Sequence, residues 1–508
     1  MKMQFRLLLT ASILLLISGC VQQAPVIQPI PGTPTHNFTN ILSPAPNTPT
    51  PWVLPTLVPN QPYFTPTPDA PRTLPTPRAN EEYYTVQFGD SLAGIASKFN
   101  VELSLLIEGN DLPDPDILEV GQVITIPVPV IGAESSDFKI IPDSELVYGP
   151  FSATLNVEDF VNSQNGYLEI HRELVDEVEL TGAQIVDRIS REFSVNPRLL
   201  LALLEYRSGW VTSRDISDEV KDYPMGLHDP IRKGLYLQLA WTSKLLNRGY
   251  YLWQLNAISY TSFSNGRIAM LAPTLNAGSA AVQYMLGAKS TPDAWSTAVS
   301  EDGVFRTYSA FFVPSFYLTF EPLLPHDLKQ PKMELPFEPG VYWSFTSGPH
   351  AGWGDGSAWA ALDFAPPGDL FGCFISDDWV TAVADGVIVR AENGAVVLDL
   401  DGDGLEQTGW TVLYMHIETR NRVTAGTHLK TGDRIGHASC EGGFSSGTHV
   451  HLARRYNGEW ISADQDIPFI LGGWTSAGDG YEYSGTLTKN DAIVYSWNGR
   501  VNDNQIGH

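Results

Sequence analysis

The feature that most limits how this chain can fold is a proline-rich stretch near its N-terminus. Sixteen of the 37 prolines lie between Val21 and Asn80, mixed with Thr, Asn and Gln. Proline removes a backbone donor and fixes φ, so this stretch cannot bury a core of its own. We expect 21–82 to form an extended, partly polyproline tether, or a glycosylated stalk with the same mechanical role. The folded domains of the 508-residue chain therefore follow it, with room for about three.

Residues 1–20 have the pattern of an export signal. Lys2 and Arg6 precede the apolar run LLLTASILLLIS, which is too short to be a permanent transmembrane helix. The following LISGC resembles a bacterial lipobox, which implies cleavage before Cys20 and a lipid on that cysteine. An ordinary secretory signal with an incidental cysteine is the alternative. Either way the chain is exported, and with the lipid it is anchored to the outer face of a bacterial membrane.

The charge of the chain limits its partners. The formal net charge is −26, which would repel phosphate backbones, so nucleic acid is not expected as a partner. No later segment is apolar enough to predict a transmembrane helix.

Segment 83–129 has a βααβ pattern. The short strand YTVQ is followed by GDSL, in which Asp90 or Ser91 can cap a helix that starts near Leu92. A second helix around 103–110 and the strand QVITIPV complete the pattern. The landmarks GDSL, IASKF, NDL and VGQVITIP strongly resemble a LysM domain, which implies binding to N-acetylglucosamine-containing glycans, mainly peptidoglycan. By this resemblance the glycan contacts fall on Gly89, Asp90, Ser91, Leu92 and Asn110.

Residues 138–330 predict a mostly helical domain. Helical periodicity is clear in GAQIVDRISREFSVNPRLLLALLEYRS, GLYLQLAWTSKLLNRG and NAGSAAVQYMLG. FSVNPRLLLALLEYRSGW faintly resembles lytic transglycosylases, but Arg207 stands where they carry the glutamate. Arginine stays protonated and cannot donate the proton, and Glu205 lies about 200° around the helix. We predict an inactive transglycosylase-like domain; an unrelated helical spacer is the alternative.

Five residues in the last third of the chain predict a hydrolytic metal site: His350, Asp363, His416, His449 and His451. A single histidine is more often a surface or hydrogen-bonded residue than a ligand. Together, however, these five offer three metal ligands and two spare imidazoles, as zinc hydrolysis requires. The segment THVHLARRY is typical of a strand, so the two histidines of His-x-His project on one side, roughly 6.5–7 Å apart.

The stretch 336–463 resembles the lysostaphin/β-lytic zinc metallopeptidases, which have an antiparallel β core and cut peptide bonds in peptidoglycan. The landmarks GPH, LDF, VTAVADGVIV, LYMHI, VTAGTHLKTGDRIG and SGTHVHL occur in order, and His350 precedes Asp363 by 13 residues, as in the β-lytic branch. The resemblance implies that His350, Asp363 and His451 bind one zinc ion. It makes His416 and His449 the catalytic histidines. The implied metallopeptidase domain spans 331–475, and 476–508 is a C-terminal extension.

Two further patterns lie in this domain. Cys373 and Cys440 are the only cysteines besides Cys20, and in an oxidising compartment we expect a disulfide between them; two independent thiols are the alternative. DLDGDG, with Asp399, Asp401 and Asp403, copies the start of a calcium loop. Trp410 stands where the bidentate glutamate belongs, which argues against Ca²⁺, and an acidic hairpin tip explains the same residues.

The sequence therefore predicts a multidomain α+β protein with a LysM module, a mostly α middle domain and an antiparallel β metallopeptidase domain. The predicted function is zinc-dependent hydrolysis of peptidoglycan peptides, with LysM bound to the glycan and the tether reaching into the cell wall. The alternative is a non-catalytic wall-binding scaffold or amidase activator. Such proteins usually lack one or more zinc ligands, and all are present here.

Overall fold

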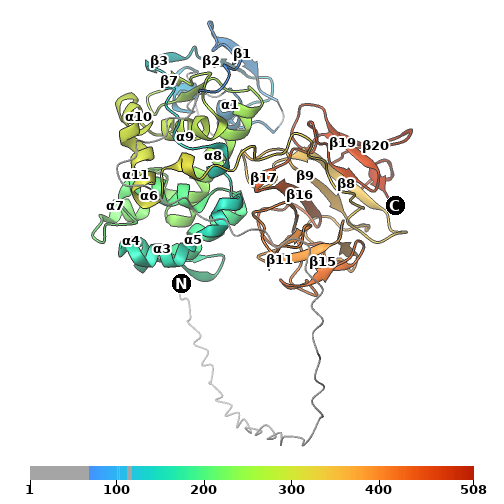
Figure 1. Ribbon diagram of the computed structural model, residues 1–508. Coiled ribbons are helices and arrows are strands. Elements are labelled where there is room, and N and C mark those ends of the chain that lie inside the picture. Colours follow the sequence, from blue (N-terminus) through green and yellow to red (C-terminus); the bar gives the residue numbers. More distant parts are fainter. Residues whose placement is uncertain (1–67, 88, 100, 102, 111, 113–116) are drawn as a thin grey trace, which may run out of the picture. The chain divides into compact units, whose positions relative to one another are not determined.

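The computed structural model describes residues 68–508, apart from 88, 100, 102, 111 and 113–116. Cys20, the export signal and the tether up to residue 67 lie outside the described residues. All of the described residues belong to one compact unit of the chain, Trp52–His508. Along it follow a small βααβ module, a helical domain and a β domain, which confirms the predicted fold class (Figure 1). None of the helices described in this unit is both long and apolar enough to cross a bilayer.

The βααβ module is held by an antiparallel strand pair and two short helices. Strand β1 (Glu82–Thr85) pairs with β2 (Val123–Ile126), and α1 (Leu92–Lys98) and α2 (Leu103–Glu108) lie between them in sequence. Ser91 caps α1 by accepting a hydrogen bond from the Gly94 amide at 3.1 Å. The apolar helix positions share a core with β2: Leu92, Ile95, Ala96, Leu106, Ile124 and Ile126.

The helical domain forms where the 3.6-residue periodicity predicted it. Its main helices are α5 (Gly182–Phe193), α6 (Pro197–Ser208), α8 (Leu235–Gln254) and α9 (Ala277–Gly287). The apolar run predicted as one helical stretch is broken between α5 and α6. Ser194 has a left-handed φ of 54°, and Asn196 caps the new helix, with Pro197 at its first position.

Shorter elements complete this domain. They are α3 (Val157–Gln164), α4 (Tyr167–Ile170), α7 (Asp218–Asp222), α10 (Pro292–Ala298) and α11 (Arg306–Phe311), with the hairpin β4 (Arg172–Val175) and β5 (Val178–Thr181). Strand β3 (Val130–Ala133), which follows the βααβ module, pairs in parallel with β7 (Arg267–Met270), itself paired with β6 (Tyr260–Ser262).

The β domain is built on one antiparallel sheet of order β14-β11-β12-β13-β16-β9-β8-β22, with β17 (Glu459–Trp460) paired to β16. The central strands are β13 (Trp410–Met415), β16 (Val450–Tyr456), β9 (Ala361–Ala365) and β8 (Trp343–His350). The remaining strands are β11 (Gly386–Glu392), β12 (Ala395–Asp399), β14 (His428–Leu429) and β22 (Gln505–Ile506). In this register His451 lies opposite Asp363 on one side and Met415 on the other.

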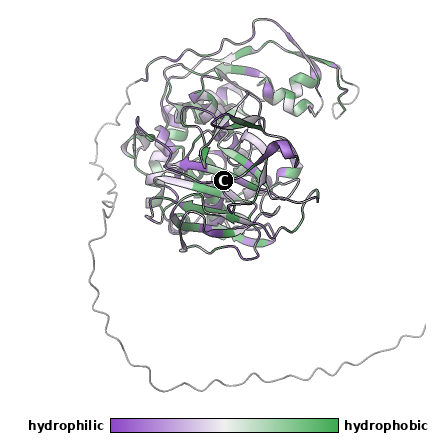
Figure 2. Ribbon diagram, turned by 90° about the vertical axis from the view of Figure 1, so that its right-hand side faces the viewer, coloured by the Kyte–Doolittle hydropathy of each residue, from purple (hydrophilic) through white to green (hydrophobic). Residues whose placement is uncertain are grey.

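The residues after 475 are built into this β domain. A second sheet consists of β18 (Ile470–Leu471), β19 (Trp474–Gly478), β20 (Gly485–Lys489) and β21 (Ala492–Tyr495), and β22 pairs with β8. The predicted boundary after 475 therefore falls inside β19. Figure 2 shows green and purple segments mixed along the strands and helices, as expected for elements that bury one face.

Candidate metal centre

The three predicted metal ligands lie on three neighbouring strands. His350 is the last residue of β8, Asp363 is in the middle of β9, and His451 is the second residue of β16. Because β9 pairs with both β8 and β16, the sheet itself brings the three side chains together. His350 and Asp363 are almost fully buried, only 4% and 7% exposed, and the His451 side chain is 12% exposed.

The facing atoms of these side chains converge on one point. Nε2 of His350 lies 3.0 Å from Nδ1 of His451 and 3.2 Å from Oδ1 of Asp363. Nδ1 of His451 is also 3.2 Å from that oxygen. For tetrahedral zinc with ligand bonds of about 2.0–2.1 Å, neighbouring ligand atoms lie roughly 3.3 Å apart. The separations therefore match a small four-coordinate cation.

Backbone carbonyls fix which nitrogen each ligand histidine presents. Nδ1 of His350 lies 2.8 Å from the carbonyl oxygen of Gly348, and Nε2 of His451 lies 3.1 Å from that of Gly352. A ring nitrogen that donates to a carbonyl leaves a lone pair on the other nitrogen. Two lone pairs and a carboxylate oxygen thus face one another, and Oδ1 of Asp363 is a buried atom without a hydrogen-bond partner. This arrangement needs a positive charge at its centre, and the donor set fits Zn²⁺.

The electrostatics of the site agree with this requirement. Burial alone would raise the pKa of Asp363, but the imidazoles of His350 and His449 overcome it and hold that pKa well below its usual value. Burial lowers the pKa of His350, and the Asp363 carboxylate more than offsets this, so the net shift is upward. The ionised carboxylate therefore attracts a positive charge to this point, either a proton or a metal ion.

His416 and His449 stand beside the three ligands. Their rings lie 4.5 Å apart between centroids, and Nε2 of His449 is 3.7 Å from Oδ2 of Asp363. Nδ1 of His449 is 2.7 Å from the Gly447 carbonyl, and Nδ1 of His416 is 3.0 Å from the Glu441 carbonyl. Both rings therefore keep an Nε2 lone pair.

His416 has an unusual backbone conformation. Strand β13 ends at Met415, and His416 follows with a φ of 64°, in the left-handed region that non-glycine residues rarely adopt. Burial, followed by the neighbouring His449 and His451, lowers its pKa to about 3. His416 is therefore neutral at physiological pH, and its Nε2 is a hydrogen-bond acceptor. The sequence predicted the residue but not the turn that redirects it.

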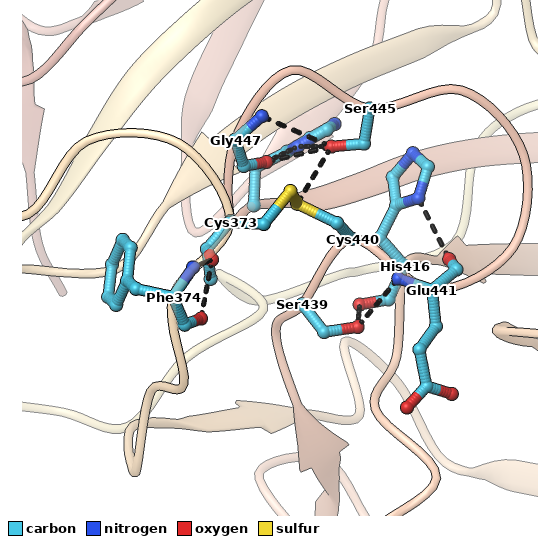
Figure 3. The surroundings of a disulfide bond; sticks show 10 residues. Cys373, Phe374, His416, Ser439, Cys440, Glu441, Ser445 and Gly447 are labelled. Atoms are coloured by element: carbon cyan, nitrogen blue, oxygen red, sulfur yellow. Dashed lines mark hydrogen bonds between the residues drawn. A yellow bond between two sulfur atoms is a disulfide. The ribbon is translucent and has the colours of Figure 1, made fainter. Parts of the chain in front are cut away.

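A disulfide ties together the loops that support the two histidines. Cys373 is bonded to Cys440, and Glu441, whose carbonyl holds His416, is the next residue (Figure 3). The Ser445 hydroxyl lies 3.4 Å from Sγ of Cys440 and donates a hydrogen bond to the Gly447 carbonyl at 2.8 Å, and that carbonyl also accepts from His449. The disulfide thus braces the carbonyl acceptors of both rings.

One residue at the site carried no signal in the sequence. Tyr483, from the loop between β19 and β20, stacks on the His350 ring at 4.8 Å between centroids, and its φ is 69°. Its amide donates to the Pro349 carbonyl at 3.0 Å, and the Gly348 amide donates to its carbonyl at 2.8 Å. A tyrosine in a turn matches no ligand or acid–base pattern, and only the fold brings it to the metal centre.

The acidic turn is explained by its own hydrogen bonds. The oxygens of Asp399, Asp401 and Asp403 gather within 4.8 Å, but Asp399 accepts the amides of Asp401, Gly402 and Gly404 at 2.9–3.2 Å. Burial and the other two carboxylates raise the pKa of Asp401 to about 7. That this turn is an acidic hairpin tip and not a calcium site remains a prediction.

Of the predicted glycan contacts of the βααβ module, Asp90, Ser91 and Asn110 make hydrogen bonds within the module, Leu92 is in its core, and Gly89 is exposed. Asp90 accepts hydrogen bonds from the Tyr84 hydroxyl at 2.8 Å and the Gln87 amide at 2.7 Å, which leaves the helix cap to Ser91. Asn110 is consumed inside the module: its amide donates to Leu106 and Thr125 carbonyls and accepts from the Thr125 amide. Leu92 is buried, whereas Gly89 is exposed with a φ of 90°. Asn110 thus has an observed structural role, and the glycan contacts remain predictions.

In the helical domain, Glu205 and Arg207 also have structural partners. The Glu205 carboxylate accepts the Val211 and Thr212 amides at 3.0 and 3.1 Å, just beyond the end of α6. Arg207 donates to Ser290 and to the Leu286 carbonyl, both at 3.2 Å. Neither side chain is arranged as a glycosidase acid, and the transglycosylase-like interpretation remains a prediction.

Three family models match the chain. The LysM domain matches residues 84–127, the LasA N-terminal domain matches 139–324, and peptidase family M23 matches 372–463. The M23 match contains His416, His449 and His451 but begins after the other two site residues. The assignment of His350 and Asp363 therefore depends on the geometry described above.

Several known proteins are similar to parts of this chain. Protease LasA of Pseudomonas aeruginosa strain UCBPP-PA14 is 26% identical over 302 residues, which cover 55% of this chain and 67% of the relative. Among solved structures, the M23 metalloprotease pseudoalterin from the deep sea is 24% identical with a TM-score of 0.28, covering 33% of this chain and 96% of that one. The catalytic domain of lysostaphin from Staphylococcus simulans is 25% identical with a TM-score of 0.18, covering 24% of this chain and 89% of that one. In order along the chain, separate segments thus match the models of the LysM domain, the LasA N-terminal domain and peptidase family M23.

Proposed function

We propose that this protein is a zinc-dependent endopeptidase that cleaves peptides of peptidoglycan. The observation that carries the proposal is the convergence of His350 Nε2, His451 Nδ1 and the buried Asp363 carboxylate on one point, within about 3 Å of one another. Two further imidazoles with free Nε2 lone pairs stand beside it. This set suits hydrolysis by an activated water molecule.

The mechanism follows from the hydrogen bonds of each ring. Zinc held by His350, Asp363 and His451 would polarise the scissile carbonyl and lower the pKa of a coordinated water to ~7. The free Nε2 of His449 takes the proton of the attacking water and returns it to the leaving amine. His416, neutral because its pKa is about 3, accepts a hydrogen bond at Nε2 and orients that water.

The other parts of the chain hold this activity at the wall. The LysM domain binds the glycan strands, and a lipid on Cys20 anchors the chain to the outer face of the membrane, with the tether spanning between them. These roles are supported by the LysM match and by the lipobox-like sequence LISGC. The mass of the N-terminal peptide from protein purified out of membranes tests the lipid.

The test of the activity is mass spectrometry of fragments released from purified peptidoglycan by the full-length protein. We expect new amine and carboxyl ends within the peptides, which identify the bond, and their loss with a chelator or with His449→Ala. His428→Ala, which removes an exposed histidine of β14, is the matched control and should cleave normally. If wild-type protein binds zinc and wall but releases no peptide ends, the scaffold or amidase-activator function replaces this proposal.

A further inference from the structure

The second sheet of the β domain, whose strands β19 and β20 are drawn in red in Figure 1, has one buried and one exposed face. In the register of β19, β20 and β21, Ser476, Leu487 and Val494 share a face. All three are buried, and the two apolar ones belong to the core of the β domain. The alternate residues form the opposite side, which we call the outer face of the second sheet: Thr475, Ala477, Thr486, Thr488, Ile493 and Tyr495.

The outer face combines hydroxyl groups with large exposed side chains and carries no charge. Its three threonines lie on β19 and β20 at half-buried positions. Next to them, Ile493 and Tyr495 of the edge strand β21 are 57% and 66% exposed. Edge strands usually carry charged residues that prevent pairing with other chains, and this protein has a net charge of −26 to draw on. An uncharged, partly aromatic face at the edge of a sheet therefore indicates a binding surface.

Trp497 extends this surface beyond the end of β21. Its side chain is 62% exposed, and its amide donates to the Phe345 carbonyl of β8 at 3.2 Å. The intervening Ser496 donates from its hydroxyl to the Tyr483 carbonyl at 3.1 Å. Tyr495 and Trp497 are thus two exposed aromatic side chains on a backbone that is already held, so little entropy is lost when a ligand covers them.

The outer face adjoins the candidate metal centre. Tyr483, whose carbonyl accepts from Ser496, stacks on the ring of His350. A Cβ on Gly485, at the start of β20, would lie 2.7 Å from the Pro349 ring, so the second sheet closely approaches the end of β8. A polymer whose peptide reaches the metal centre therefore passes near the outer face.

The side chains of this surface suit a neutral sugar polymer. A pyranose ring has an apolar C–H face that stacks on an aromatic ring, and hydroxyl groups that exchange hydrogen bonds with threonine. An anionic membrane surface would require Lys or Arg on the outer face, which has neither. The core of a stable dimer interface would be more apolar than a face in which three of the six residues are threonine. In peptidoglycan the peptides are joined to glycan strands, so the polymer next to a bound peptide is a glycan.

We propose that the outer face of the second sheet, together with Trp497, is a second glycan-binding site, distinct from the LysM domain. Tyr495 and Trp497 stack on sugar rings, and the threonines bind the sugar hydroxyls. The site holds a glycan strand beside the metal centre, whereas the LysM domain binds glycan elsewhere. It goes beyond the proposed peptidase activity and requires neither zinc nor hydrolysis, so failure of that activity would leave its tests unchanged.

The first test locates bound glycan on the full-length protein by amide hydrogen exchange. The probe is soluble glycan strands from which an amidase has removed the peptides. We expect slower exchange in two separate segments, 84–127 of the LysM domain and 484–497 of the second sheet. Protection in 84–127 alone would overturn the proposal.

The second test removes the aromatic rings. Tyr495→Thr, which keeps a β-branched residue in the strand, and Trp497→Ala should each raise the glycan concentration for half-maximal protection of 484–497 about 2–10-fold. Protection of 84–127 should stay as in wild type. Tyr342→Ala removes a tyrosine that is 59% exposed in the same domain but is not part of the outer face, and it should leave both segments unchanged. Wild-type protection of 484–497 in both ring variants would refute the site.

Sedimentation without glycan tests the competing occupant, a second copy of the chain. We expect wild type and Trp497→Ala to sediment alike at every concentration. If wild type associates with itself and Trp497→Ala does not, the outer face is a contact between copies and the proposal is wrong.

Discussion

Glu459 makes the stability of the protein depend on pH in a direction opposite to that of an ordinary salt-bridged carboxylate. It is the first residue of β17, is 5% exposed, and its carboxyl group faces α8, where Tyr250 and Gln254 donate hydrogen bonds to it. Burial raises its pKa from 4.5 to about 7, and the hydrogen bonds from Gln254 and Tyr250 offset only part of that shift. The folded protein therefore retains a proton on this carboxyl group at pH values where the unfolded chain has lost it.

The sign and size of the effect follow from this difference. Between pH 4.5 and about 7 the folded state binds more protons than the unfolded state, so the free energy of unfolding falls as pH rises. A pKa of about 7 in the folded state against 4.5 in the unfolded chain corresponds to about 3 kcal/mol in the free energy of unfolding, at ~1.36 kcal/mol per pH unit. This contribution is fully present below pH 4.5 and is lost as the pH rises through about 7.

The assay is urea denaturation of wild type and Glu459→Gln at pH 5 and pH 8, followed by tryptophan fluorescence. Glutamine keeps the size and hydrogen-bonding capacity of the side chain but does not ionise. We expect the variant to gain about 2–3 kcal/mol on wild type between the two pH values. Glu301→Gln, at an exposed position, is the control and should track wild type. If wild type and Glu459→Gln change in parallel with pH, the reasoning about this buried carboxylate is refuted.

Three further changes test other parts of the structure. His449→Ala should lower kcat by about 10²–10⁴-fold, because it removes the proposed base and no proposed ligand. Zinc content, measured by elemental analysis, should be unchanged; loss of zinc would instead make His449 a ligand. Cys440→Ser opens a disulfide that joins residues 67 positions apart, and should cost up to about 4 kcal/mol in urea denaturation. An unchanged midpoint would show that the bond adds no stability. Asn110→Ala removes three hydrogen bonds to Leu106 and Thr125 and should lower the stability of the LysM module by about 2–3 kcal/mol. We expect faster amide exchange in 83–129 with unchanged peptidase rates; amides that stay protected there would contradict the structural role of Asn110.

Much of the fold was predictable because local patterns and tertiary packing agree in it. The helices in 182–208, 235–254 and 277–287 follow from apolar spacing, and β16 from the β-branched residues and aromatics around His-x-His. The break between α5 and α6 was also encoded, since Asn196 and Pro197 form a helix start. A continuous apolar run concealed it.

The parts that escaped prediction depend on contacts between residues distant in sequence. Tyr483 reaches His350 because the loop between β19 and β20 is hydrogen-bonded to β8 at Gly348 and Pro349. The loop 351–360 is shaped by Lys244 and Trp460, about a hundred residues away on either side. The left-handed φ of His416 has no sequence signal either, since non-glycine residues adopt it only where the surrounding structure enforces it.

The His-x-His pair shows how the backbone divides two identical side chains between two tasks. Strand periodicity places His449 and His451 on the same side of the sheet but does not say which one binds the metal. The Gly447 carbonyl takes Nδ1 of His449 and leaves Nε2, the nitrogen farther from the backbone, which lies 3.7 Å from Asp363. The Gly352 carbonyl takes Nε2 of His451 and leaves Nδ1, which lies 3.2 Å from the same carboxylate. One ring is thereby held among the three proposed ligands and the other beside them, so in the proposed mechanism the difference between ligand and base depends on two carbonyl groups that no side-chain pattern reveals.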